Sequence, residues 1–118
     1  MDTVNCQHKE LANGGWKELS FYLQMGNIGS EVSRSLRWYG KNEKRFRVSF
    51  ERALELFDLT IEYAPRRSGA LTEVCRAREE FCDYFNGNSW GTDGAKMLRY
   101  YDQFAILGME QEKKLLTK

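Results

Sequence analysis

Lysine and arginine gather in one short stretch of this 118-residue chain. Seven basic residues against two acidic ones between positions 34 and 52 give the stretch a charge of about +5, whereas the whole chain carries +1. Positive side chains at this density bind phosphate groups, and aromatic side chains among them stack on nucleic-acid bases. The alternative interpretation of these basic residues is that they only form a solvated helical surface. The candidate residues for binding a nucleic acid or an acidic protein partner are Arg34, Arg37, Trp38, Lys41, Lys44, Arg45, Arg47 and Arg52.

A row of four carboxylates, Glu51, Glu55, Asp58 and Glu62, follows at steps of three and four residues. This spacing predicts one side of a helix, which would bind a metal only with ligands from a second helix. Carboxylate-bridged bundles complete such sites with Glu-x-x-His pairs, but the only histidine, His8, lies near the N-terminus. We therefore expect a solvated face or ion pairs between subunits. A small metal-binding or enzymatic bundle is the alternative function.

The cysteines and the histidine offer little further chemistry. Cys75 and Cys82 are seven residues apart on one expected helix, where thiols act as packing groups. Cys6 and His8 are two metal ligands, fewer than the four of a structural zinc site. A single histidine also leaves no nucleophile, base and acid set for a hydrolase. We expect no catalytic residue, no metal and no cofactor, and reduced thiols.

The apolar residues predict four amphipathic helices that position these groups. The first runs from residue 16 to the stop at residues 40–42, and the second is capped by Asn42 and ends near residue 63, before Pro65. The third ends at residues 86–88. The fourth starts after a cap at Thr92 or Asp93 and reaches residue 108, with its continuation to residue 116 undecided.

The distribution of apolar residues also indicates the domain organisation and the cellular location. Residues 1–15 lack a stable period and predict a flexible N-terminal arm with a short helical attempt at residues 9–12, and residues 16–118 predict one domain. No apolar run approaches the roughly 20 residues of a membrane span, and the first residues lack the pattern of a signal peptide. We expect a cytoplasmic protein that does not enter a membrane.

Two glycines three residues apart, Gly26 and Gly29, stand inside the first predicted helix. A phosphate-binding loop would need further glycines or Gly-Lys-Ser/Thr after a strand, and no strand is expected. Small residues allow close approach of a neighbouring helix, so we assign both glycines to helix packing, within the chain or between subunits. Trp90, in the loop at residues 86–94, is expected to cover the end of the bundle, with an interface anchor as the alternative.

A resemblance to a known family is carried by residues 27–56. Asn27-Ile28, Glu31, Arg34 and the glycine turn at Gly40, followed by Phe46 and Ser49-Phe50-Glu51-Arg52-Ala53-Leu54-Glu55-Leu56, resemble the small bacterial four-helix-bundle proteins encoded in ribosomal-RNA intervening sequences. They also resemble the related accessory proteins of diversity-generating retroelements. The family has an Asn-Ile-Ala-Glu-Gly segment, whereas this chain has Gly29-Ser30 in place of one small residue and no glycine after Glu31.

The resemblance implies a helical bundle and rings of identical subunits. For the retroelement branch it also implies binding of a reverse transcriptase and nucleic acid through a basic surface. The helix pattern itself predicts an all-α, antiparallel up-down four-helix bundle. We expect a non-enzymatic interaction or assembly module, homo-oligomeric through an aromatic-rich flank. A purely structural subunit is a third possibility.

Overall fold

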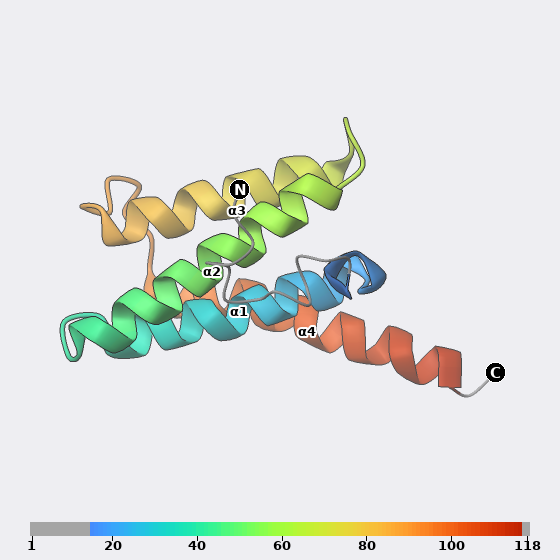
Figure 1. Ribbon diagram of the computed structural model, residues 1–118, viewed down its shortest axis with the longest axis horizontal. Helices are drawn as coiled ribbons and strands as arrows, with labels where there is room; N and C mark the ends of the chain where they lie inside the picture. Colours follow the sequence, from blue (N-terminus) through green and yellow to red (C-terminus); the bar gives the residue numbers. More distant parts are fainter. Residues whose placement is uncertain (1–14, 117–118) are drawn as a thin grey trace.

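The computed structural model describes residues 15–116 and shows an all-helical chain over that range (Figure 1). The predicted all-α class is confirmed, since no strand occurs among these residues. The arm predicted for residues 1–15 lies outside the described residues except for Gly15. In chain order, the elements are the short 3-10 helix η3 (Trp16–Glu18) and four α-helices, α1 (Phe21–Trp38), α2 (Glu43–Tyr63), α3 (Gly69–Phe85) and α4 (Gly94–Leu116).

Polar side chains before the helices fix where each one begins. Ser20, Asn42 and Ser68 each accept a hydrogen bond from the backbone N–H three residues ahead, the standard geometry of an N-cap. Asp93 accepts from the N–H of Ala95 at 2.8 Å. The cap predicted at Asn42 is therefore confirmed. Of the two caps predicted for the fourth helix, Thr92 or Asp93, the structure uses Asp93, and α4 continues to Leu116.

The first helix begins later than the sequence predicted. Leu19 has extended backbone angles, so the chain makes a separate turn at Trp16–Glu18 before Ser20 starts α1. The buried indole of Trp16 donates to the Thr60 hydroxyl at 2.8 Å, and Gln24 donates to the Trp16 carbonyl at 2.9 Å. These bonds attach the turn to α2, a long-range contact that periodicity does not reveal.

Helix α1 is the central helix of the fold and packs extensively against both α2 and α4. Helix α3 lies on α2 and makes only marginal contact with α4. Figure 1 is consistent with the predicted antiparallel up-down order of the four helices. The core includes Ile28, Phe57, Phe81 and Tyr101, one large side chain from each helix.

Glycines allow the close approach of α1 and α4. A Cβ atom at Gly29 would lie 2.4 Å from the Cβ of Tyr101, and one at Gly26 would lie 3.0 Å from the Cα of Ala105. On α4, a Cβ at Gly108 would lie 2.7 Å from a methyl carbon of Leu23. Both glycines of α1 thus face a helix of the same chain.

Candidate functional site

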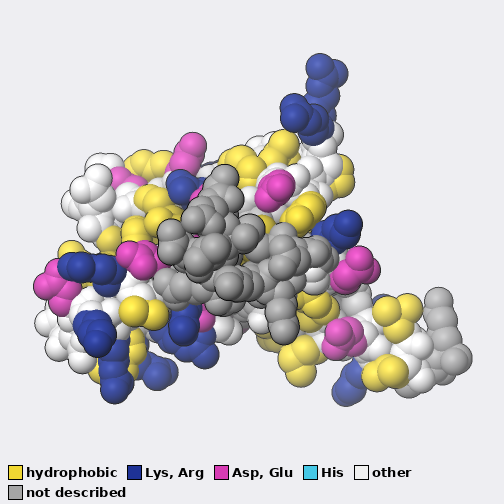
Figure 2. All heavy atoms as spheres, in the orientation of Figure 1, with side chains coloured by type: hydrophobic (Ala, Val, Ile, Leu, Met, Phe, Trp, Pro, Cys, Tyr) yellow, Lys and Arg dark blue, Asp and Glu magenta, His cyan; other side chains and the backbone are white. Residues whose placement is uncertain are grey.

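The turn between α1 and α2 brings the basic residues to one end of the protein. Gly40 has a φ of +74°, which the absence of a side chain allows, and the N–H groups of Lys41 and Asn42 both donate to the Trp38 carbonyl. The last turn of α1 therefore lies beside the first turns of α2. Figure 2 shows lysine and arginine side chains gathered at this end of the molecule.

A hollow of about 360 Å³ lies between the two helices at this end. Five of the eight predicted binding residues line it, and we call these five the basic end: Arg34, Trp38, Lys44, Arg45 and Arg52. The other three predicted residues, Arg37, Lys41 and Arg47, are exposed on the same hairpin but do not line the hollow.

Arg34 and Arg47 are cations of this hairpin that pair with carboxylates on their own helices. Arg34 pairs with Glu31, whose carboxylate is buried, and Arg47 pairs with the exposed Glu43 at 3.0 Å. The guanidinium carbon of Arg45 lies 4.6 Å from the centre of the Trp38 ring, a cation–π contact. One face of the Trp38 ring therefore carries a guanidinium, so this face is not free for direct stacking on a base.

The position of Lys44 and Arg45 on α2 has an electrostatic consequence. Both lie in the first turn of the helix, where the unpaired N–H groups and the helix dipole place partial positive charge. Cations at a helix start lower stability, and Glu43 is the only acidic residue in that turn. An anion bound in the hollow would interact favourably with the side chains and with the helix end together.

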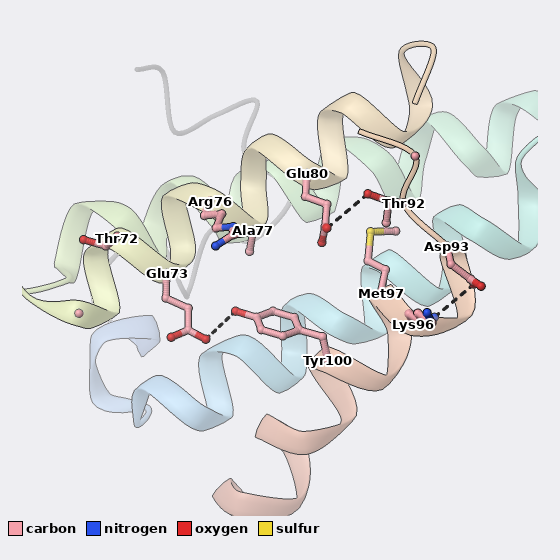
Figure 3. Close-up of a pocket in the computed structure, with 12 residues that line it drawn as sticks. Thr72, Glu73, Arg76, Ala77, Glu80, Thr92, Asp93, Lys96, Met97 and Tyr100 are labelled. Carbon is pink, nitrogen blue, oxygen red and sulfur yellow. Dashed lines mark hydrogen bonds between the residues drawn. The ribbon is translucent and has the colours of Figure 1, made fainter. Parts of the chain in front are cut away.

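A larger cavity, of about 830 Å³, separates α3 from the start of α4 (Figure 3). Its lining mixes charges: Glu73, Arg76 and Glu80 come from α3, and Lys96 and Tyr100 come from α4. The Tyr100 hydroxyl donates to Glu73 at 2.8 Å, while the Thr92 hydroxyl donates to Glu80 at 3.3 Å. Burial, followed by the hydrogen bond to Glu73, raises the pKa of Tyr100.

Sequence reasoning missed this cavity entirely. Its residues come from α3, from α4 and from the loop between them, and Glu73 and Tyr100 are 27 residues apart. No periodic pattern in the sequence marks a place where two helices remain apart. The cavity is large enough for a small organic molecule, since such sites are about 300–1,000 Å³.

The acidic row contributes an ion pair to the fold, and the cysteines of α3 are partly buried. Asp58 pairs with Arg78 of α3 at 2.9 Å, and residues 15–116 contain no group of three His, Cys, Asp or Glu side chains placed to hold a metal. Cys75 and Cys82 are free thiols of intermediate burial, and burial raises the pKa of Cys82, which keeps this thiol protonated. The pair Cys6 and His8 lies outside the described residues.

Trp90 does not cover the end of the fold, contrary to the expectation from the sequence. Trp90 is 49% exposed, in a loop whose backbone is hydrogen-bonded to Asp83 near the end of α3. The Asp83 carboxylate accepts hydrogen bonds from the Ser89 hydroxyl, the Ser89 N–H and the Trp90 N–H. These bonds, led by that of the Ser89 hydroxyl, lower the pKa of Asp83.

Comparisons with family models, curated proteins and solved structures found no significant match to this chain. None of the helices formed by residues 15–116 has the length and apolar character needed to cross a membrane.

Proposed function

We propose that this chain is a non-enzymatic binding module whose basic end binds nucleic acid in single-stranded form, for which single-stranded RNA serves as the probe. The observation that carries the proposal is the convergence of four cations from two helices on one hollow. Two of them, Lys44 and Arg45, stand at a helix start where positive charge lowers stability. A surface that is unfavourable in the free protein is typical of a binding site, because natural proteins accept such costs for function.

The chemistry of binding would be contact with the phosphate backbone. Lys44 offers ammonium donors to phosphate oxygens, Arg52 adds positive charge to the same hollow, and the start of α2 adds its dipole. Arg45, with its guanidinium carbon 4.6 Å from the centre of the Trp38 ring, would present a planar cation on which a base can stack. Nothing in this arrangement reads base edges, so we expect little sequence preference.

An acidic protein is the other partner expected from the sequence. A phosphate backbone supplies closely spaced charges along a thin strand, which suits a hollow of about 360 Å³ better than a broad protein surface does. We therefore rank nucleic acid first and include a polyglutamate peptide as a competitor in the test. Equal competition by that peptide would favour the acidic protein.

The proposal also includes self-association and a cytoplasmic location. We also propose a relationship to the family that residues 27–56 resemble. The proposed order of the helices is an antiparallel up-down bundle, with which the course of α1 to α4 is consistent. The alternative of a metal-binding bundle has less support, since Asp58 of the acidic row is paired with Arg78.

The sharpest test is Lys44→Glu, since this single change affects binding and stability in opposite directions. We expect the variant to bind a fluorescent single-stranded RNA roughly tenfold more weakly, which corresponds to about 1.4 kcal/mol. The free variant should be more stable by about 0.3–1 kcal/mol, because a negative charge suits a helix start. Fluorescence anisotropy measures the first quantity and urea unfolding measures the second.

Arg66→Glu is the matched control, with the same change of charge at an exposed position in the turn after α2, far from the basic end. It should change the RNA affinity less than about twofold, the small effect of long-range charge under salt screening. If both variants weaken binding equally, the RNA affinity depends only on the net charge of the protein, and the basic end is not the binding site. Unchanged binding by Lys44→Glu would also refute the proposal.

A further inference from the structure

Two aromatic residues are exposed at the end of the molecule that carries the basic end. Tyr39 is 52% exposed in the turn between α1 and α2, and Trp90 is 49% exposed in the loop between α3 and α4. Figure 1 shows these two connections at the same end of the molecule. The other large apolar residues that residues 15–116 expose lie near the end of α4: Ile106, Leu107, Met109, Leu115 and Leu116.

Two phenylalanine rings hold the ring of Tyr39 in place. The ring centre of Tyr39 lies 5.1 Å from that of Phe46 on α2 and 5.0 Å from that of Phe85 at the end of α3. Phe46 and Phe85 are themselves 5.0 Å apart, so the three rings contact one another. Tilted and edge-to-face contacts of this kind favour fixed ring orientations. Both phenylalanines are only partly buried, and we call Tyr39, Phe46 and Phe85 the aromatic platform.

The aromatic platform adjoins the basic end through the α1–α2 turn. Trp38, which lines the hollow, directly precedes Tyr39, and consecutive Cα atoms are about 3.8 Å apart. The exposed Lys41 follows two residues after Tyr39, and its N–H donates to the Trp38 carbonyl at 2.9 Å. The hollow lies between α1 and α2, whereas the platform reaches α3, so a strand that contacts both must cross this turn. Lys41 supplies positive charge at the crossing.

Phosphate contacts alone do not separate a single strand from a duplex, because both carry the same charged groups. An aromatic surface does separate them, since the bases of a duplex are stacked on one another and only an unpaired base can turn onto a protein side chain. One face of Trp38 already carries the guanidinium of Arg45. Tyr39 is more than half exposed although its ring is held by two neighbours, which makes it the better stacking surface.

We propose that the aromatic platform is the base-stacking part of the nucleic-acid site, with Tyr39 as the residue on which an unpaired base of the bound strand stacks. The strand would run from the hollow across the α1–α2 turn, past Lys41, to the platform. Because Phe46 and Phe85 fix the Tyr39 ring before binding, little side-chain entropy is lost when the base stacks. The role of the platform rests on the proposed function, and it would give the site its selectivity for single strands.

The test compares Tyr39→Leu with Tyr39→Phe on two fluorescent probes, a single-stranded RNA and a strand with the same number of phosphates but no bases. Leucine retains apolar contact with the two phenylalanines but offers no ring, whereas phenylalanine retains the ring. We expect Tyr39→Leu to bind the RNA roughly tenfold more weakly, the loss of about one stacked base, and to bind the baseless strand within about twofold of the unchanged protein. Tyr39→Phe should bind both probes like the unchanged protein. Fluorescence anisotropy measures the four affinities.

The salt dependence of each loss separates stacking from charge. Stacking displaces no counterion, so the factor by which Tyr39→Leu weakens RNA binding should be the same at about 50 and 200 mM salt. The factor for Lys44→Glu should shrink over this range, because salt weakens the contribution of its charge. A Tyr39→Leu effect that shrinks in the same way would overturn the stacking role.

The matched control is Trp90→Leu, which removes an almost equally exposed aromatic residue that contacts no other aromatic ring within residues 15–116. It should leave the RNA affinity within about twofold of the unchanged protein, because Trp90 is not part of the platform. An equal loss for Trp90→Leu and Tyr39→Leu would overturn the assignment to Tyr39. Circular dichroism and urea unfolding check that the variants fold, and binding of the baseless strand gives a second check.

The two probes distinguish failure of the platform from failure of the proposed function. If the unchanged protein binds neither probe, or if Lys44→Glu weakens neither, the basic end and the platform are overturned together. If Lys44→Glu weakens both probes while Tyr39→Leu weakens neither, only the platform is overturned. The same holds if Tyr39→Leu weakens both probes equally, since its effect would then not depend on the bases.

Discussion

At the scale of single residues, close packing rather than chemistry explains the glycines of α1. Gly29 and Gly26 lie where α1 meets α4, and each would bring an added Cβ to 3.0 Å or less from that helix. An interior glycine lowers helix stability by up to about 1 kcal/mol relative to alanine. Close contact between the helix backbones, and the burial that it permits, offsets this cost.

Gly29→Ala should therefore destabilise the protein despite the higher helix propensity of alanine. The added methyl group would lie 2.4 Å from the Cβ of Tyr101, which belongs to the buried core and cannot move aside without repacking. We expect a loss of about 1–3 kcal/mol in the free energy of unfolding, measured by urea denaturation. Gly69→Ala is the control, since no atom lies within 4 Å of its added Cβ, and it should be neutral or slightly stabilising. Equal effects of the two changes would contradict the packing explanation.

At the scale of elements, polar caps and one carboxylate decide how the helices begin and how the loop before α4 is held. Asn42 starts α2 close behind α1, which creates the basic end. Asp83 holds the loop after α3, because it accepts hydrogen bonds from two backbone N–H groups and one hydroxyl of the segment that carries the exposed Trp90. The cap was predictable from its position before an apolar period, whereas the reach of Asp83 across six residues was not.

The loop should become less ordered at low pH. The folded-state pKa of Asp83 lies below its ordinary value of 3.8, so these bonds stabilise the loop above that pH, and the stabilisation is lost as pH falls through the folded pKa. We expect the amide resonances of Ser89 and Trp90 to titrate together with a midpoint below 3.8. Asp83→Asn should abolish this titration. A midpoint at or above the ordinary value would show that the bonds do not form in solution.

At the scale of the whole molecule, the basic end and the exposed apolar residues of α4 lie at opposite ends. The basic end lies at the α1–α2 turn, and the exposed apolar residues lie at the end of α4 (Figure 2). Between them, α3 remains apart from α4 and leaves the cavity lined by Glu73 and Tyr100. A chain with a net charge of only +1 can thus carry a strongly local positive site.

RNA binding should accordingly depend steeply on salt although the protein is nearly neutral. Arg34 is already paired with Glu31. If the other three cations of the hollow each displace a counterion from single-stranded RNA, the logarithm of affinity should fall with the logarithm of salt at a slope of about −2. Anisotropy titrations between about 50 and 200 mM salt measure this slope. Lys44→Glu should reduce its magnitude by about one. A slope near zero would mean that phosphate contacts do not drive binding.

The sequence by itself determined the helices and most of their ends, because caps, a proline and apolar periods act within a few residues. It also determined that positive charge gathers around the α1–α2 turn, because a short turn keeps neighbouring residues together. Only the tertiary structure decided that Arg45 lies over Trp38, that α3 separates from α4, and that Trp90 and the end of α4 are exposed. These features depend on how helix faces meet across long distances in the chain, where many side-chain contacts compete and no local pattern records the outcome.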